Sequence, residues 1–320
     1  MWQSSTSKIL LESWANMSFL KELEELKVDR ISGASDLARK AAEILVGFSK
    51  ETKSPDNQRF LIELTKLGKS LIAAQPESVP IFNLVNSILL ATEHVRESLA
   101  LSDLRNFTYE KAQEFKSNSL KALDRIAIWG MPLIENNFKI MTISNSTAVY
   151  YILRKAKQGR TNFEVYVPES RPVFEGRLLA KKLADLGISV HLITDASMGH
   201  FIGRINLILV GADCISETTF TNKVGTWYLA LLAKEFKIPF FVASERSKFI
   251  SELVRKKGSF FGNPQEVWEG NSDKIEIENP YFEQIPLSYC KKFITNDGFF
   301  VPSQIPKTIR KSRVSQDLLA

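Results

Sequence analysis

The side chains best placed for chemistry are a carboxylate, an amide and an ammonium group that follow one apolar run. Asp213 comes directly after Ile208–Ala212, and Asn222 and Lys223 stand shortly downstream. A carboxylate held at the end of a buried strand is costly unless it is paired or neutralised, so its pKa should rise. Asp213 is therefore either a general acid–base near neutral pH or a capping or ion-paired aspartate, and position alone does not separate these. Asn222 and Lys223 suit a sugar hydroxyl and a phosphate, or form an ordinary turn.

Two further segments could meet a phosphate. Ser144 and Ser146 follow an apolar run and precede a helical pattern, and Gly33, Ala34 and Ser35 open another helical pattern. The N-terminus of a helix presents unpaired N–H groups and the positive end of a dipole, which favours anions. For Ser144 and Ser146 taken by themselves, helix capping is the favoured interpretation.

Arg171 is a third candidate contact for an anion. It follows the apolar run Phe163–Val167, and its guanidinium has the fork geometry that binds phosphate or carboxylate through two bonds. The alternative is an internal ion pair between Arg171 and Glu169 that braces the same loop. The sequence leaves both open.

The elements that position these residues change character along the chain. Residues 1–125 show apolar positions three and four apart, which predicts a helical domain. Residues 126–320 alternate strand-like runs with helical segments, which predicts a Rossmann-like parallel sheet covered on both faces and followed by a C-terminal tail. The predicted strands are Phe138–Ile143, Phe163–Val167, Ser189–Ile193, Ile205–Val210 and Pro239–Val242. The fold class is therefore α/β, and ligands should bind beyond the carboxyl ends of the strands.

Composition narrows the function classes. With 320 residues, a formal net charge of +6 and basic residues scattered in pairs, the chain favours a solvated surface over a nucleic-acid interface. No apolar run is long enough to span a bilayer, and a cytoplasmic location is expected. The three histidines and two cysteines, Cys214 and Cys290, show no metal-ligand spacing, and both nucleotide-binding glycine motifs are absent. We expect no metal and no cofactor.

Four motifs together resemble a known family: Glu169–Pro172, Glu175–Gly176, Gly211–Asp213 and Asn222–Thr226. They are similar to the alpha, beta and delta subunits of eukaryotic translation initiation factor 2B and to the related isomerases of methylthioribose-1-phosphate and ribose-1,5-bisphosphate. The resemblance implies a helical N-terminal domain and a Rossmann-like domain through which the chain forms a homodimer or joins related subunits. It also implies a phosphorylated small-molecule ligand.

The chain departs from the isomerase pattern. Where the isomerases read His-Cys-Asn, it has Ile143, Ser144 and Asn145, and their Arg-Gly-Ala appears as Ser32–Ala34. A later Arg-Pro appears as Gln75 and Pro76, and Arg30 could compensate in part for the first missing arginine. A serine has a much higher pKa than a cysteine and exchanges protons poorly near neutrality. Adjacent residues of an extended segment point to opposite faces, so Cys214 should not replace the missing thiol.

The resemblance implies a catalytic pair, Asp213 and Ser144, the latter at the cysteine position. The implied substrate-binding residues are Gly33, Ala34, Ser35, Asn145, Ser146, Arg171, Asn222 and Lys223. Two hypotheses follow: an initiation factor 2B subunit-like protein with a regulatory or assembly role that binds a sugar phosphate or nucleotide, or an aldose–ketose isomerase of a phosphorylated pentose. A small-metabolite sensor is the third, and the first is favoured.

Overall fold

The chain folds into two compact units. The structure is a computed structural model that describes Trp14 and residues 17–29, 32–255, 261–270, 272 and 274–319. Described residues up to 120 and from 312 onward form a helical unit, and residues 121–311 form a sheet unit. The division expected from the sequence lay at residues 125 and 126 and kept the C-terminal tail with the sheet.

The helical unit has one apolar core. Its aromatic centre is made by Phe19, Phe48 and Phe60, all fully buried, with Phe48 stacked on Phe60 at 5.5 Å between ring centroids. The side chain of Asp56 begins one helix by accepting a bond from the N–H of Arg59 at 2.7 Å. The helices are α2 (Ser18–Val28), α3 (Ala34–Glu51), α4 (Asn57–Ala74), α5 (Val79–Val95), α6 (Leu101–Gly130, which continues into the sheet unit) and α12 (Gln316–Leu319).

Hydrogen bonds to α5 explain why the tail belongs with the helices. Asn86 donates to the carbonyl of Arg313 at 2.8 Å and accepts from the N–H of Ser315 at 2.8 Å. The hydroxyl of Ser315 donates to Glu93 at 2.5 Å. Because Asn86 and Ser315 are buried, these bonds satisfy groups that would otherwise be costly to bury.

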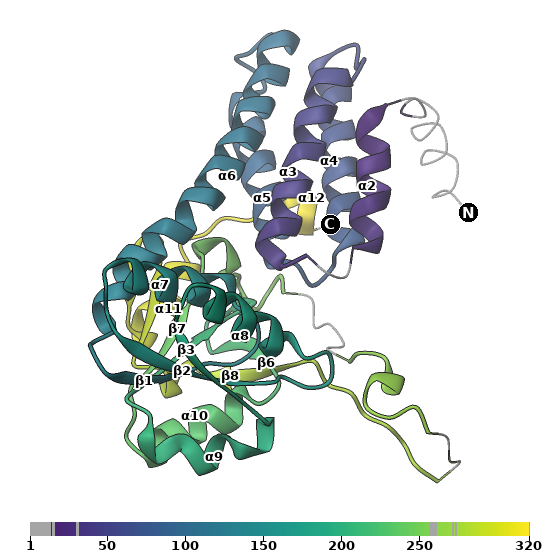
Figure 1. The fold of residues 1–320 in the computed structure, drawn as a ribbon. Helices are drawn as coiled ribbons and strands as arrows, with labels where there is room; N and C mark the ends of the chain where they lie inside the picture. The colour runs from purple at the N-terminus through teal and green to yellow at the C-terminus, as the bar shows by residue number, and fades with distance from the viewer. Residues whose placement is uncertain are drawn as a thin grey trace. The chain divides into compact units, whose positions relative to one another are not determined.

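The sheet unit is built on seven strands in the order β10-β9-β7-β4-β1-β2-β3, all parallel except β10. Figure 1 labels β1, β2, β3 and β7 of this sheet. The strands are β1 (Phe138–Met141), β2 (Phe163–Pro168), β3 (Ser189–Ile193), β4 (Leu207–Gly211), β7 (Phe240–Ala243), β9 (Lys292–Thr295) and β10 (Gly298–Phe300). The helices are α7 (Thr147–Gln158), α8 (Glu175–Asp185), α9 (Met198–Phe201), α10 (Thr226–Glu235) and α11 (Ile305–Ile309).

Alternate residues of the central strands enter two different cores. Leu207 and Leu209 pack with α7 and α8, whereas Ile208 and Val210 pack with α9 and α10. Every residue of β4 and β7 is buried, as the sequence predicted for central strands covered on both faces. The five predicted strands form five of the six parallel strands; β9, which pairs with β7, was not predicted. The α/β fold class is confirmed.

A second, three-stranded sheet was not predicted. It is antiparallel in the order β5-β6-β8, from β5 (Cys214–Ile215), β6 (Thr219–Lys223) and β8 (Phe282–Pro286). This small sheet carries the chain from the end of β4 to Asn222 and Lys223. Within the part of the chain that the structure describes, no helix is both long and apolar enough to cross a membrane.

Candidate functional site

The sheet unit changes winding direction between β1 and β4. The chain runs from β1 outward through β2 and β3, then returns to place β4 on the other side of β1, with Met141 opposite Ile208. In open parallel sheets, ligands bind beyond the carboxyl ends of the strands at such a switch point. Ser144 follows β1 and Asp213 follows β4, so both lie at this edge.

The loop after β1 is tightly fixed. Ser144 has a left-handed backbone, with φ of 65°, and its N–H donates to the hydroxyl of Ser170 at 2.9 Å. Ser146 accepts from the N–H of Val149 at 3.4 Å and so caps α7, the interpretation that the sequence favoured. A methyl group at Gly211 would collide with the side chain of Ser146, so β4 and this loop are in close contact. The amide oxygen of Asn145 accepts from Lys182 of α8 at 3.3 Å.

The loop after β2 is held by Asp195. The two carboxylate oxygens of Asp195 accept from the N–H groups of Ser170 and Arg171, each at 2.8 Å. Glu169 pairs with Arg177 at 2.6 Å. The alternative interpretation of the sequence, an ion pair between Glu169 and Arg171, is therefore wrong.

The guanidinium of Arg171 instead donates to backbone oxygens of a later segment. Its Nη2 lies 3.0 Å from the carbonyl of Val267 and 3.4 Å from that of Glu266. These bonds tie the loop after β2 to a segment nearly one hundred residues later in the chain. Any ligand contact by Arg171 would compete with them.

Asp213 is the carboxyl group with acid–base character at this edge. Burial raises the pKa of Asp213, and the ammonium groups of Lys248 and Lys223 oppose that rise. Lys248 Nζ lies 4.0 Å from Asp213 Oδ1 and donates to the carbonyl of Ala212 at 2.8 Å. The Asp213 side chain keeps 42% of its surface exposed. A carboxyl group surrounded by protein but reachable from solvent can exchange a proton with a ligand.

Lys223 is fully buried and pairs with the carboxylate of Glu175. Its Nζ lies 3.0 Å from Glu175 Oε1 and 4.7 Å from the ring centroid of Tyr281, and it is 1% exposed. Asn222 is also buried and donates to the hydroxyl of Thr226 at 2.9 Å, which in turn donates to the carbonyl of Lys223 at 2.6 Å. These bonds fix both residues at the start of α10.

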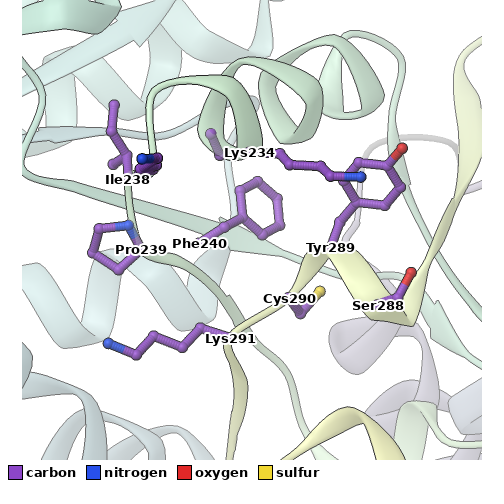
Figure 2. Close-up of a pocket in the computed structure, with 10 residues that line it drawn as sticks. Lys234, Ile238, Pro239, Phe240, Ser288, Tyr289, Cys290 and Lys291 are labelled. Carbon is purple, nitrogen blue, oxygen red and sulfur yellow. The ribbon is translucent and has the colours of Figure 1, made fainter.

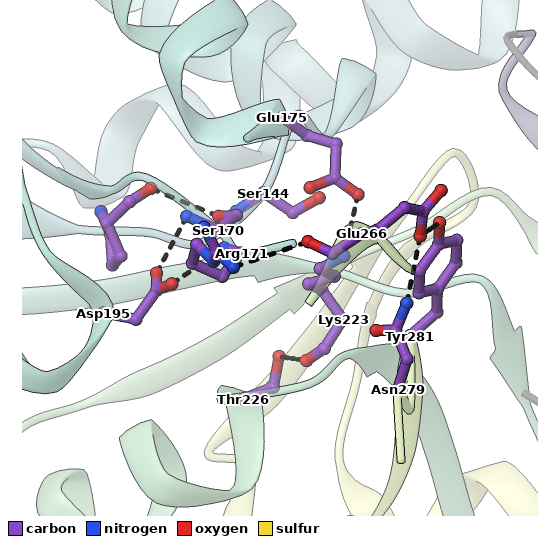
Figure 3. Close-up of polar contacts among 11 residues, drawn as sticks. Ser144, Ser170, Arg171, Glu175, Asp195, Lys223, Thr226, Glu266, Asn279 and Tyr281 are labelled. Carbon is purple, nitrogen blue, oxygen red and sulfur yellow. Dashed lines mark hydrogen bonds and ion pairs between the residues drawn. The ribbon is translucent and has the colours of Figure 1, made fainter. Parts of the chain in front are cut away.

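A network of polar groups surrounds Lys223 (Figure 3). The phenol of Tyr281 hydrogen-bonds to Glu266, and Asn279 donates to the same carboxylate at 3.0 Å. Glu266 also offers its carbonyl to Arg171, so the network connects the loop after β2 with the small sheet. In Figure 3, Glu175, Lys223 and Tyr281 lie on one side and Asp195 with Ser170 on the other.

Neither cysteine is prepared for chemistry at this edge. Burial raises the pKa of Cys214 to about 11 and that of Cys290 well above its ordinary value, so both thiols are protonated near neutral pH. Among the residues that the structure describes, no group of three or more His, Cys, Asp or Glu side chains could hold a metal ion.

Gly33, Ala34 and Ser35 lie in the helical unit. Gly33 precedes the first turn of α3, and its carbonyl accepts from the N–H of Leu37 at 3.0 Å. The first turn also contains Asp36, whose carboxylate would repel an anion there. Their role as ligand contacts stays a prediction, and Arg30 lies outside the described residues.

Several residues of the site were not selected from the sequence. Lys248 and Tyr281 follow Asp213 by 35 and 68 positions, and no motif marks either one. Glu175 was named only within the family motif Glu175–Gly176, and Asp195 was not among the implied site residues. Only Glu175 could have been recognised from the sequence. An acidic residue in the first turn of a helix is common, and Glu175 could have been considered as an ion-pair partner of Lys223.

Comparisons with known proteins agree with this architecture. Residues 30–302 match the family described as the initiation factor 2 subunit family. The chain is 32% identical over 299 residues to a ribose 1,5-bisphosphate isomerase of Methanocaldococcus jannaschii, covering 90% of this chain and 93% of that protein. It is 33% identical over 284 residues to a putative translation initiation factor eIF-2B subunit 2-like protein of Pyrococcus furiosus, covering 88% of this chain and 96% of that protein.

Two solved structures share the fold. The translation initiation factor eIF-2B of Pyrococcus horikoshii superposes with a TM-score of 0.74 at 30% identity, over 91% of this chain and 98% of that one. The 5-methylthioribose 1-phosphate isomerase of the same organism superposes with a TM-score of 0.73 at 25% identity, over 92% of this chain and 86% of that one.

Proposed function

The chain belongs to the initiation factor 2 subunit family, and from that membership we propose that it is an initiation factor 2B subunit-like protein with a regulatory or assembly role. It binds a sugar phosphate or nucleotide at the switch point and does not isomerise it. Relatives of similar identity carry both an initiation-factor name and an isomerase name. The choice between the two therefore rests on the residues of the site.

One observation carries the proposal: the loop after β1 has a serine, and burial keeps the thiols of Cys290 and of Cys214, next to Asp213, protonated. Aldose–ketose exchange near neutral pH needs a second group that can give and take a proton beside Asp213. The hydroxyl of Ser144 has a pKa far above the ~8.5 of a free thiol, so it serves poorly in that role. Binding needs only fixed donors and positive charge, which Asn222 and Lys223 supply.

The isomerase remains the second candidate because Asp213 keeps a raised pKa and Lys223 is positioned and buried. In that reaction, Asp213 and Ser144 would exchange protons with the sugar, while Asn145, Ser146, Arg171, Asn222 and Lys223 would hold it. These roles would require Arg171 to leave the carbonyls of Glu266 and Val267.

We further propose that the protein is cytoplasmic and forms a homodimer, or joins related subunits, through its sheet unit. In support, α10 exposes Trp227, Tyr228 and Leu231, each with 39–45% of its surface accessible. Exposed aromatic and aliphatic residues on one short helix are typical of an interface.

Calorimetric titration with ribose 1,5-bisphosphate and with 5-methylthioribose 1-phosphate tests the binding part of the proposal. We expect saturable binding of at least one ligand, and at least tenfold weaker binding in a Lys223→Met variant that remains folded. Equal affinity in wild type and variant would place the ligand elsewhere. Absence of binding by both ligands would leave assembly as the only proposed role.

A further inference from the structure

A pocket lies at the end of the sheet unit opposite the switch point, where β7 and β9 begin rather than end. It has a volume of about 490 Å³, within the range of small-molecule sites. The pocket is lined by the end of α10, the residues that lead into β7 and the turn before β9. Figure 2 shows the ring of Phe240 near its centre, with Tyr289 and Cys290 on one side. It shares no lining residue with the switch point.

Three of the lining residues are lysines and none is acidic. Lys234, Lys237 and Lys291 line the pocket. Across the described part of the chain, no carboxylate forms a salt bridge with any of the three. Lys234 Nζ lies 5.4 Å from the ring centroid of Tyr289. Uncompensated like charges around one recess repel one another, and that repulsion falls when an anion enters.

The backbone that carries these lysines is fixed. Lys237 adopts a left-handed conformation, with φ of 56°, and the N–H of Ile238 donates to the carbonyl of Ala233 at 2.8 Å. The N–H of Lys291 donates to the carbonyl of Phe240 at 2.8 Å. Lysines at the end of α10 also stabilise the negative end of that helix. Lys291 comes from a different segment, and its Nζ lies 5.9 Å from the ring centroid of Phe241. Helix stabilisation therefore does not explain all three lysines of the lining.

We propose that this pocket binds a small polyanion that carries at least two phosphate or carboxylate groups. The lysines bind the charged groups, and Ile238, Pro239 and Phe240 contact the rest of the molecule. A molecule of this size fits a recess of about 490 Å³, whereas an extended acidic chain would need a longer basic track. The site is independent of the switch point, so the protein has two anion sites at opposite ends of one sheet.

The test is calorimetric titration with pyrophosphate and, separately, with citrate, at low ionic strength. In the pocket variant Lys237→Gln/Lys291→Gln, we expect Kd to rise at least about tenfold, because two charge-assisted contacts are lost. The matched control Lys155→Gln/Lys157→Gln removes the same charge from α7, where neither lysine forms an ion pair within the described residues. The Kd of this control variant should stay within twofold of the wild-type Kd. Binding of pyrophosphate alone identifies a phosphate site, and binding of citrate as well identifies a general polyanion site.

A second variant separates the two anion sites. Glu175→Gln/Lys223→Gln removes both charges of the switch-point pair and should leave pyrophosphate binding at the pocket intact. Loss of binding in this variant alone would assign the anion to the switch point and overturn the proposal. Equal losses of pyrophosphate affinity in the pocket variant and its lysine control would show an effect of net charge alone and would overturn the proposal. Unchanged pyrophosphate binding in the pocket variant would also overturn it, as would no binding by wild type.

Discussion

The ammonium group of Lys223 lies 3.0 Å from Oε1 of Glu175, in a position where the lysine is only 1% exposed. The second carboxylate oxygen of Glu175 is buried and has no hydrogen-bond partner among the described residues. A buried lysine needs its counter-charge, but the same carboxylate repels an incoming phosphate. We therefore expect Glu175 to affect both the stability of Lys223 and the affinity of the switch point for the proposed anionic ligand.

Glu175→Gln separates these two effects. We expect the variant to be less stable by about 1–3 kcal/mol, less than for a fully enclosed pair because Glu175 is a quarter exposed. Its affinity for ribose 1,5-bisphosphate should rise about tenfold, since a repulsive charge is lost. Chemical denaturation and calorimetry measure the two quantities. Glu164→Gln, which removes an exposed partner of His191, is the control and should change neither.

Asp213 should lower the stability of the folded protein at neutral pH. Burial raises the pKa of Asp213 in the folded state. The folded protein therefore gains stability from the protonated carboxyl group below the ordinary pKa near 3.9, and it loses this stability as the pH rises through the pKa of Asp213 in the folded state. Asp213→Asn should therefore increase the free energy of unfolding at pH 7, and the difference should shrink as the pH approaches 4.

Denaturant unfolding at several pH values measures this difference. Asp185→Asn, an exposed member of a helix ion pair, is the matched control and should show little effect at any pH. A wild type more stable than Asp213→Asn at pH 7 would show that Lys248 and Lys223 outweigh burial.

Gly176 sits where α8 begins against the end of β2. A methyl group there would collide with the carbonyl of Pro168, which is backbone and cannot rotate away. Gly176→Ala should lower the free energy of unfolding by about 2 kcal/mol or more. Gly203→Ala is the control, because no atom lies within 4 Å of the added methyl group. Thermal unfolding of the two variants compares them, and equal melting temperatures would contradict the close packing of α8 on β2.

Ser144→Cys should introduce the group that the site lacks. A thiol exchanges protons near neutrality far better than a hydroxyl, and the N-terminal end of α7 favours its thiolate. We expect slow conversion of ribose 1,5-bisphosphate where wild type gives none, and loss of that activity on adding Asp213→Asn. An inactive Ser144→Cys variant that still binds the ligand would show that the differences from the isomerases extend beyond one atom.

Leu231→Arg tests the proposed association through α10. Leu231 is 45% exposed, so an arginine there should not disturb the core. If α10 forms the interface, the variant should run as a monomer in light scattering while wild type runs as a dimer or larger species. The control is Leu178→Arg, at a position on α8 that is 56% exposed, and it should keep the mass of wild type.

The sequence was sufficient for five of the six parallel strands because each of the central ones is a short apolar run flanked by turns, and Ile208–Val210 is buried on both faces. It also placed Ser144 and Asp213 at one edge, since carboxyl ends of adjacent parallel strands meet there. The small sheet was missed because its strands, such as Thr219–Lys223, are short and polar and depend on pairing with residues about sixty positions away.

Side-chain partners were the least predictable part of the site. Glu169 has two arginines within reach in sequence, and the backbone turn at Ser170 and Asp195 decides that Arg177 is its partner. Lys248 reaches Asp213 only because the segment after β7 returns past the end of β4. Long-range approaches of this kind leave no periodic or motif signal in the sequence.

The central claim is that the switch point binds a phosphorylated ligand without converting it. The most direct measurement is NMR observation of ribose 1,5-bisphosphate with wild-type protein at a concentration that calorimetry shows to be saturating. We predict binding with no ketose product over many hours. Formation of ketose by wild type, abolished in Asp213→Asn, would contradict the claim and make Ser144 part of a working isomerase.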